Sequence, residues 1–363
     1  MKIFIVAGEH SGDSHAAELI CALKDARPDA EFYSAGGKEL AKHTTQVVDL
    51  TQIAVTGFFE VISLLPKILG IMKELVKDIE AIDPDIVIFT DFPDFNFNLA
   101  KKIAKPHRKL VYFISPQLWA WRKGRIKTVK RLFDKMLVIF PFEATFYRKQ
   151  KVKATFVGNP IVNTIRQRQI SAKPVEKKDK PYILLLPGSR VKEINMNLAA
   201  MVDAKFLIEK DIEADFAVLK HPELDPELFS YAKEKDITIV ENDSFDEFAK
   251  TDLAIACSGT VTLELALSGV PSVVMYKVAA STYFIGKTLI NVVGVAMPNI
   301  ILGHHVFPEL LQDAASPEAL AAEAVSILSD EKRALEIKKE LKRLHTLISP
   351  FDPRLAASEV LSI

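Results

Sequence analysis

Two loops in the second half of the chain carry residues suited to binding a diphosphate. The first is Leu186-Pro187-Gly188-Ser189-Arg190, which follows an apolar run and precedes a helical pattern. Its glycine lets the backbone approach a ligand closely, and an arginine guanidinium forms forked hydrogen bonds with phosphate oxygens. One such charge-assisted bond contributes about 1.5–3 kcal/mol. An ordinary strand-to-helix turn with a surface arginine explains this pentapeptide equally well.

The second loop runs through Ser258, Gly259 and Thr260 into a helix that carries Glu264. The first N–H groups of a helix and the positive end of its dipole suit a phosphate. Thr260 and Glu264 share a helix face, so Glu264 could accept hydrogen bonds from two ribose hydroxyls while the phosphates lie at the helix start. A Ser or Thr cap followed by an acidic turn is the competing explanation. Together the two loops predict a nucleotide diphosphate site.

Other phosphate and metal motifs do not fit the sequence. No lysine follows a glycine at the spacing of a Walker loop, and residues 8–13 do not match G-x-G-x-x-G, which disfavours a dinucleotide oxidoreductase. Asp83-Pro84-Asp85 resembles the D-x-D metal motif of some transferases, but it precedes a predicted strand and we interpret it as a turn. We expect no metal and no cofactor, because Arg190 and a helix N-terminus can neutralise the phosphates.

Parallel sheets must position these loops, because short apolar runs alternate with longer helical patterns in both halves. The predicted strands are Ile3–Ala7, Glu31–Ala35, Asp85–Thr90, Lys109–Ser115, Met136–Phe140, Tyr182–Leu186, Asp215–Leu219, Ile237–Val240, Leu253–Cys257 and Ser272–Tyr276. The fold class is therefore α/β. Ligands in such folds bind outside the carboxyl ends of the strands.

The length of 363 residues suits two domains. A polar, proline-bounded stretch over residues 166–181 is the best linker. It separates a first domain, residues 1–165, from a second, residues 182–348. We expect a tail helix within residues 349–363 that packs back on the first domain or on a partner chain, and a homodimer is left open.

Composition limits the function further. Hydrophobic residues make up 49%, and 47 basic residues balance 47 acidic ones, so nothing favours a nucleic-acid partner. The two cysteines, Cys21 and Cys257, match neither a disulfide framework nor a metal site, which favours a reduced, cytoplasmic chain. No stretch reaches about eighteen apolar residues, so we expect no membrane-spanning helix.

One segment, residues 53–72, is nevertheless unusually apolar. Apolar residues recur there at helical spacing and leave only a narrow polar stripe. Two basic clusters lie elsewhere in the first half: Lys101, Lys102, Lys105, Arg108, Lys109, and Arg122, Lys123, Arg125, Lys127, Lys130, Arg131. An apolar helix beside basic residues would dock on an anionic membrane surface without spanning the membrane. A helix buried between domains fits the pattern as well.

Six segments follow, in order, the motifs of a known family. They are Val6-Ala7-Gly8-Glu9-His10-Ser11-Gly12-Asp13, Asp91-Phe92-Pro93-Asp94-Phe95-Asn96, Ser115-Pro116-Gln117-Leu118-Trp119-Ala120-Trp121-Arg122, Leu185-Leu186-Pro187-Gly188-Ser189-Arg190, Ser258-Gly259-Thr260 and Met297-Pro298-Asn299. The chain resembles, over nearly its whole length, the lipid-A-disaccharide synthases. The tryptophan motif is the most specific of the six.

The resemblance implies a GT-B architecture, two Rossmann-like domains with parallel sheets facing across a cleft. It implies transfer of 2,3-diacylglucosamine from UDP-2,3-diacylglucosamine to the 6-hydroxyl of 2,3-diacylglucosamine 1-phosphate. The anomeric configuration inverts, giving a β-1,6 disaccharide and UDP. Acylated substrates favour the membrane-docked interpretation, with the protein peripheral on the inner face of the cytoplasmic membrane. The expected membrane-facing residues are Phe58, Phe59, Leu65, Leu69 and Met72.

The resemblance also suggests residue roles. Arg190, Glu264 and Asn299 match positions on the UDP side, beside Ser258, Gly259 and Thr260. Asp94 matches a position essential to activity. We hypothesise that it is the base that takes the proton of the acceptor hydroxyl, a step that contributes about 10²–10⁴-fold. A cap on the helix that follows is the commoner use of such an aspartate.

An acceptor or active-site loop is expected from Glu9, Ser11, Asp13 and Arg122. For Ser11 or Asp13 a cap on the next helix is comparably plausible, and Arg122 could instead stack on an aromatic ring.

The sequence departs from the family's pattern in three places. His10 stands where a small residue is common, and Asn159 stands where the family has histidine. The segment Leu302-Gly303-His304-His305 replaces an A-G-R sequence. Competing functions are another GT-B UDP-sugar transferase, a UDP-sugar epimerase, or a non-catalytic UDP-sugar-binding protein.

Overall fold

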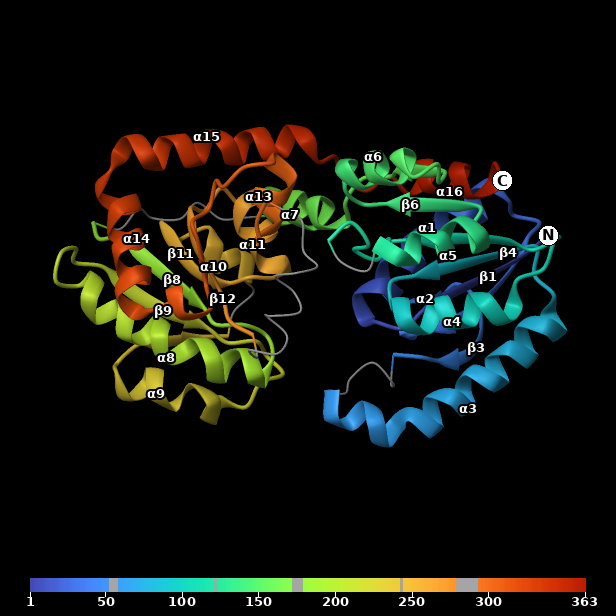
Figure 1. Cartoon of the computed structure of the whole chain (residues 1–363), viewed down its shortest axis with the longest axis horizontal. Coiled ribbons are helices and arrows are strands. Elements are labelled where there is room, and N and C mark those ends of the chain that lie inside the picture. The colour runs from blue at the N-terminus through green and yellow to red at the C-terminus, as the bar shows by residue number, and fades with distance from the viewer. Residues whose placement is uncertain (52–57, 121–122, 172–178, 242–243, 279–292) are drawn as a thin grey trace. The chain divides into compact units, whose positions relative to one another are not determined.

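The computed structural model describes residues 1–51, 58–120, 123–171, 179–241, 244–278 and 293–363; at 58–65, 123, 169–171 and 244 it describes the backbone alone. The chain divides into two compact units, each with its own parallel sheet (Figure 1). Unit 1 comprises Met1–Pro160 and Pro350–Ile363, and unit 2 comprises Ile161–Ser349.

Unit 1 is built on seven parallel strands in the order β3-β2-β1-β4-β5-β6-β7. The strands are β1 (Lys2–Ala7), β2 (Glu31–Gly36), β3 (Thr45–Asp49), β4 (Ile86–Thr90), β5 (Lys109–Phe113), β6 (Lys135–Val138) and β7 (Ala154–Phe156). The helices are α1 (His10–Ala26), α2 (Lys38–Ala41), α3 (Phe58–Ile82), α4 (Pro93–Ile103), α5 (Ile126–Leu132), α6 (Pro141–Lys149) and the tail helix α16 (Pro353–Leu361).

Helices cover both faces of this sheet, which explains why its strands are continuous apolar runs. Side chains alternate between the two faces along β1. Phe4 and Val6 pack in one core with residues of α3, α4, α5 and α6. Ile3 and Ile5 pack in the other core with residues of α1 and α16.

The tail returns to unit 1 although it lies at the far end of the sequence. Helix α16 packs beside α1 (Figure 1). Backbone N–H groups of Phe351 and Asp352 donate to the carbonyls of Asn159 (3.2 Å) and Val157 (2.9 Å). This crossing is so close that a Cβ on Gly158, whose φ is +84°, would lie 1.9 Å from the Pro350 oxygen.

Unit 2 is built on six parallel strands in the order β10-β9-β8-β11-β12-β13. The strands are β8 (Tyr182–Leu186), β9 (Asp215–Leu219), β10 (Thr238–Val240), β11 (Leu253–Cys257), β12 (Ser272–Tyr276) and β13 (Glu309–Leu311). The helices are α7 (Pro160–Ser171), α8 (Val191–Ile208), α9 (Ser230–Glu234), α10 (Ser244–Phe248), α11 (Thr260–Leu267), α13 (Met297–Leu302), α14 (Pro317–Ser329) and α15 (Glu331–Leu347).

The ten strands expected from the sequence are all present, each within two residues of its expected ends. One helical detail differs from expectation, because residues 166–171, assigned to the linker, are the last turns of α7. The chain from Pro317 to Leu347 forms two helices, α14 and α15, because the Asp330 side chain caps the second by accepting the Arg333 N–H.

Strand order reverses once in each sheet, beside β1 in unit 1 and beside β8 in unit 2. At such a point the loops after two neighbouring strands lead away from each other and leave a crevice at the carboxyl edge. The loops at these two positions follow β1 and β4, and β8 and β11. These four loops hold most of the residues that the sequence singles out.

The crossing at Gly158 gives a test of the fold. Because Gly158→Ala would strain a left-handed residue and press a Cβ on the Pro350 carbonyl, we expect unfolding free energy to fall by at least ~1–3 kcal/mol. Gly70→Ala is the matched control, since a Cβ there meets no atom within 4 Å and alanine stabilises a helix by about 0.5–1 kcal/mol. Urea unfolding of both variants measures the difference. Equal stability of the two would contradict the described crossing.

Candidate active site

The loop after β8 makes a tight turn into α8. Gly188 has a φ of +132°, and a Cβ there would lie 2.5 Å from the Glu193 side chain. Glu193 reaches back to the turn, accepting the Ser189 N–H (2.9 Å) and a hydrogen bond from Arg190 Nη1 (2.9 Å). The Arg190 side chain is 79% exposed, so its guanidinium is tethered on one side and accessible to an anion.

Strand β11 pairs with β8, and the loop that follows β11 leads directly into α11. Gly259 is the N-cap of α11 and no side chain caps the helix, so the capping explanation for Ser258 and Thr260 does not hold. Ser258 instead donates its hydroxyl to the Val295 carbonyl (2.9 Å). Among the residues that the structure describes, none has an atom within 4 Å of where a Cβ on Gly259 would lie. Glu264 lies in α11, half-buried.

Asn299 has a different environment from the one expected. It is fully buried in α13, and its Oδ1 accepts the N–H groups of Val306 (2.8 Å) and Phe307 (2.9 Å). Its Nδ2 donates to the Phe307 carbonyl (2.9 Å) and to Glu309 (2.7 Å). The amide is therefore fully engaged in holding this loop.

Glu309, which the sequence did not single out, organises the same loop. Its carboxylate accepts the N–H groups of Val295 (2.8 Å) and Ala296 (2.9 Å) as well as the Asn299 amide. Gly294 permits this approach, because a Cβ there would lie 2.3 Å from Glu309 Oε1. Since Ser258 also bonds Val295, the β11 loop and the 294–299 segment form one connected structure.

In unit 1, Asp94 lies in the first turn of α4, just past the carboxyl end of β4. The N-cap is Phe92 and no side chain caps this helix, so Asp94 is not the cap. Its carboxylate pairs instead with the guanidinium of Arg125, and its side chain remains 66% exposed. A polar group at this edge of a parallel sheet is accessible to a ligand.

The turn that carries Asp94 is strained. Asp91 and Phe92 have φ angles of +48° and +43°, in the left-handed region that non-glycine residues avoid. The Asp91 carbonyl accepts bonds from Asn96 Nδ2 (2.7 Å) and the Tyr112 hydroxyl (2.6 Å), which hold the turn. Gly8 makes room for the Phe92 ring, 2.4 Å from where a Cβ would lie.

Asp91 is the first residue of the 91–96 motif, and the sequence gave no reason to assign it a role of its own. Burial, followed by the negative charge of Glu9, raises the pKa of the Asp91 carboxyl to about 6. Asp91 follows β4 and Glu9 follows β1, and these strands pair at Ala7 and Thr90. The neighbouring ends of β1 and β4 therefore bring together two carboxyl groups, of which Asp91 has a pKa raised to about 6.

The three residues expected in the loop after β1 have different environments in the structure. Glu9 is half-buried and Ser11 is exposed at the start of α1. Asp13 is buried and its carboxylate accepts the N–H groups of Gly37 (2.6 Å) and Glu39 (2.8 Å). The expectation that Asp13 serves the active-site loop is wrong in this respect, because its oxygens cap α2 instead.

The tryptophan motif is anchored on α6. Trp119 Nε1 donates to the buried carboxyl of Glu143 (3.0 Å), and the hydroxyls of Ser115 and Tyr147 lie 2.7 Å apart. Burial raises the pKa of Glu143 to about 8 despite this hydrogen bond. Arg122, expected near the acceptor, lies outside the described residues.

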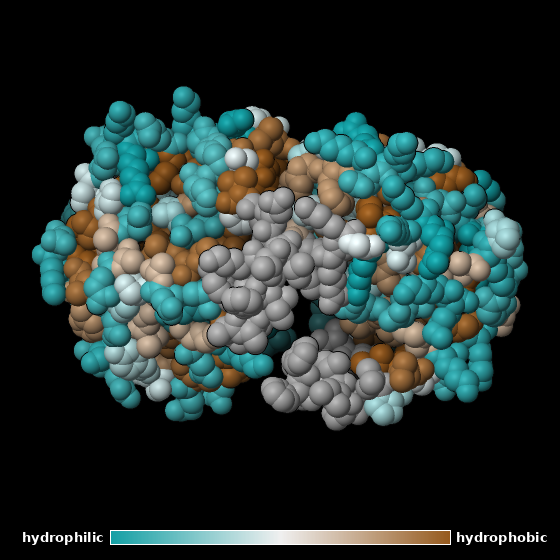
Figure 2. All heavy atoms as spheres, viewed as in Figure 1, coloured by the Kyte–Doolittle hydropathy of each residue, from teal (hydrophilic) through white to brown (hydrophobic). Residues whose placement is uncertain are grey.

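The apolar helix α3 presents fewer residues to solvent than the sequence suggests. Met72, expected to face a membrane, is 5% exposed and lies in the unit 1 core with Leu75 and Ile79, one stripe of the helix. Leu69 is 57% exposed, and apolar atoms reach the surface over α3 (Figure 2). The side chains of Phe58, Phe59 and Leu65 lie outside the described residues.

Residues 83–85 form a turn at the amino end of β4, as interpreted from the sequence. Asp83 has a φ of +49° and pairs with Arg108 (2.7 Å), while Asp85 accepts the Lys2 N–H (2.7 Å). Within the part of the chain that the structure describes, no cluster of three or more metal-ligating side chains occurs.

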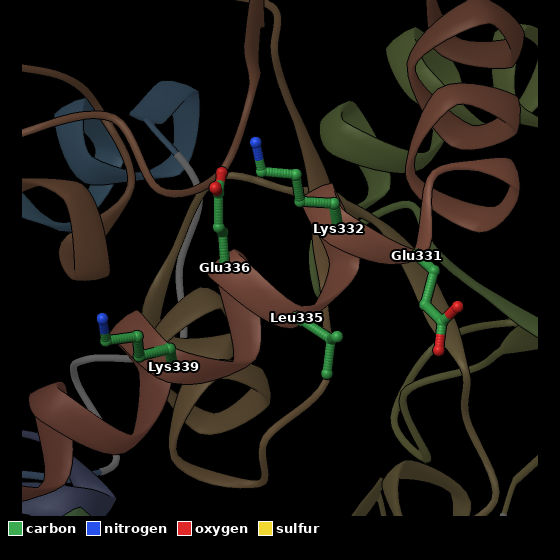
Figure 3. A pocket seen from close by; sticks show the side chains of 5 residues that line it. All are labelled: Glu331, Lys332, Leu335, Glu336 and Lys339. Atoms are coloured by element: carbon green, nitrogen blue, oxygen red, sulfur yellow. The ribbon is translucent and has the colours of Figure 1, made fainter.

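Unit 2 also has an open depression that is lined by none of the residues of the β8 and β11 loops. All five of its lining residues come from α15 (Figure 3): Glu331, Lys332, Leu335, Glu336 and Lys339. It contains none of the residues that the sequence predicts for the site.

The fold defines the class of protein first. A UDP-GlcNAc 2-epimerase from Neisseria meningitidis, solved with UDP-GlcNAc, matches with a TM-score of 0.60 at 12% identity, covering 100% of this chain and 99% of that one. The glycotransferase of kitacinnamycin matches with a TM-score of 0.57 at 14% identity, covering 99% and 98%. Identities this low show the fold alone, which is the α/β fold of the GT-B class.

Sequence comparison then defines the family. The family model described as lipid-A-disaccharide synthetase matches residues 3–360. A lipid-A-disaccharide synthase of Syntrophus aciditrophicus is 38% identical over 352 residues, covering 94% of this chain and 92% of the relative. One of Myxococcus xanthus is 40% identical over 331 residues, covering 89% and 86%. The chain belongs to the lipid-A-disaccharide synthetase family and is a glycosyltransferase of lipid A biosynthesis.

Among the helices that the structure describes, none has a stretch both long and apolar enough to cross a membrane.

Glu143 makes the stability of unit 1 depend on pH. The ordinary pKa of a glutamate is 4.5, and burial raises the pKa of Glu143 to about 8, so between these values the folded chain keeps a proton that the unfolded chain releases. The contribution of Glu143 to the free energy of unfolding is therefore greatest below pH 4.5 and falls as pH rises towards 8. We expect Glu143→Gln to remove this decline, measured by urea unfolding at pH 5, 6.5 and 8. The exposed Glu234→Gln should keep the wild-type slope, and a Glu143→Gln slope equal to wild type would contradict the assignment.

Proposed function

We propose that the chain transfers 2,3-diacylglucosamine from UDP-2,3-diacylglucosamine to the 6-hydroxyl of 2,3-diacylglucosamine 1-phosphate, with inversion at the anomeric carbon. The products are the β-1,6 disaccharide 1-phosphate and UDP. The observation that carries this proposal is family membership over nearly the whole chain together with a carboxylate, Asp94, at the carboxyl end of β4.

The donor's nucleotide is proposed to bind unit 2 at the crevice between the β8 and β11 loops. Arg190 would neutralise the diphosphate, whose oxygens would also accept N–H groups at the start of α11, from Ser258, Gly259 and Thr260. Glu264 would accept hydrogen bonds from the ribose. We propose that Asn299 supports the donor site without contacting UDP, because its amide holds the loop that joins Ser258 and Glu309.

In the chemical step the Asp94 carboxylate takes the proton of the acceptor's 6-hydroxyl. The freed oxygen attacks the anomeric carbon of the donor, and the bond from that carbon to the phosphate oxygen breaks with its electron pair going to UDP. Glu9 and Ser11 border the same edge of unit 1 and would contact the acceptor sugar. The step needs a base and charge stabilisation at the leaving phosphate, and Asp94 and Arg190 supply these groups.

The acyl chains of both substrates make a membrane surface the natural source of substrate. We propose that α3 docks through Leu69 and its apolar neighbours on an anionic bilayer, at the inner face of the cytoplasmic membrane. Basic residues of unit 1 would add attraction to anionic lipids.

Two substitutions separate the proposed roles. Asp94→Asn should lower kcat by about 10²–10⁴-fold, because the base is lost, while leaving UDP affinity unchanged. Arg190→Ala should weaken UDP binding by about 10- to 150-fold, which corresponds to one charge-assisted contact. Calorimetry with UDP and a coupled assay of UDP release measure both. Wild-type turnover in Asp94→Asn would contradict the assignment of Asp94 as the base.

The membrane proposal is tested by flotation with vesicles of phosphatidylethanolamine and phosphatidylglycerol. Leu69→Glu should reduce the bound fraction about tenfold or more, since a buried leucine contributes about 1.5–3 kcal/mol. Leu335→Glu is the matched control, because Leu335 is 60% exposed on α15 of unit 2. Equal flotation of the two variants and wild type would contradict docking through α3.

A further inference from the structure

The ion pair between Asp94 and Arg125 joins the proposed base to the segment that follows the tryptophan motif. Arg125 ends a short 3-10 helix, Lys123–Arg125, directly before α5. Its guanidinium reaches α4, where its Nη2 donates to Asp94 Oδ1. The sequence places Arg125 in a basic cluster that could add attraction to an anionic membrane surface, yet its side chain is only 31% exposed.

The guanidinium is held from a second direction. It lies over the ring of Phe97, 5.3 Å from the centroid. Phe97 and Asp94 are three residues apart on α4, so they lie on one face of the helix. Arg125 therefore contacts two neighbouring side chains of the same helical turn, one by charge and one by its flat face.

Phe97 is itself fixed in the core. It is 4% exposed and packs against Tyr112, at 5.8 Å between ring centroids, and Phe133, at 5.7 Å. The Tyr112 hydroxyl donates to the Asp91 carbonyl, in the strained turn that begins α4. A continuous set of contacts thus links Arg125 to the turn that carries Asp94.

An exposed ion pair contributes little to folding stability. Its effect on orientation is larger, because an aspartate that is 66% exposed samples several rotamers unless a partner holds it.

We propose that Arg125 is a positioning residue that holds the Asp94 carboxylate in one orientation for proton transfer. This inference rests on the proposed role of Asp94 as the base. Arg125 touches no reacting atom. It acts on the reaction only through the carboxylate, so its loss should affect the chemical step and leave donor binding unchanged.

The experiment compares Arg125→Gln, Arg125→Lys and Asp94→Asn with wild type in the full chain. Arg125→Gln should lower kcat about 10- to 100-fold, as expected for a misplaced catalytic group. UDP affinity and the melting temperature should remain unchanged, and Arg125→Lys should recover most of kcat.

Arg27→Gln serves as the matched control, since Arg27 forms an exposed pair with Asp29 of the same kind. It should behave as wild type in every measurement. Adding Arg125→Gln to Asp94→Asn should cost no further activity, because the two act through one group.

The outcomes separate the inference from the proposed function. An active Asp94→Asn enzyme overturns the role of Asp94 itself. An inactive Asp94→Asn enzyme together with an Arg125→Gln enzyme of wild-type kcat overturns only the inference. Loss of kcat in both Arg125 variants, with a lowered melting temperature, also overturns it, because Arg125 would then be structural.

Discussion

The reversal of strand order beside β1 and β8 is the constraint on which the proposed site depends. All strands of each sheet are parallel, so every carboxyl end lies at one edge, and only at the reversal do two adjacent loops lead away from each other. Residues after β1 and β4 and after β8 and β11 meet at such edges without being close in sequence. In the proposed function, unit 1 supplies the base and unit 2 supplies the groups that bind the nucleotide.

The two crevices differ in charge, in a way that suits their proposed partners. The unit 2 loops offer an exposed arginine and an uncapped helix start, both suited to an anion. The unit 1 loops offer carboxyl groups, with Asp94 paired to Arg125 and Asp91 buried near Glu9. Burial and a neighbouring negative charge raise the pKa of Asp91, whereas Asp94 lies beside a cation, so one short turn holds two unlike carboxyl groups.

The buried strands and the four loops could be predicted from the sequence, because a parallel strand covered on both faces is a short apolar run bounded by small residues. Three of the four edge strands, β3, β7 and β13, could not, since their side chains are only partly buried and carry no such pattern. The expectations for Asp13 and Met72 are wrong because their tertiary partners, the N-terminus of α2 and the unit 1 core, cannot be read from local pattern. Glu309 and Glu143 gave no sequence signal, and Arg125 gave only that of a basic cluster, because their contacts are with residues distant in the sequence.

The central claim is that this chain joins two acylated sugars. It is tested most directly by incubating the purified protein with UDP-2,3-diacylglucosamine, with and without 2,3-diacylglucosamine 1-phosphate, and following UDP release and product structure by NMR. The account predicts UDP release only with the acceptor, in step with a disaccharide whose new linkage is β-1,6. UDP release or a C2-epimerised sugar without the acceptor, or nucleotide binding with no release in either case, would contradict it.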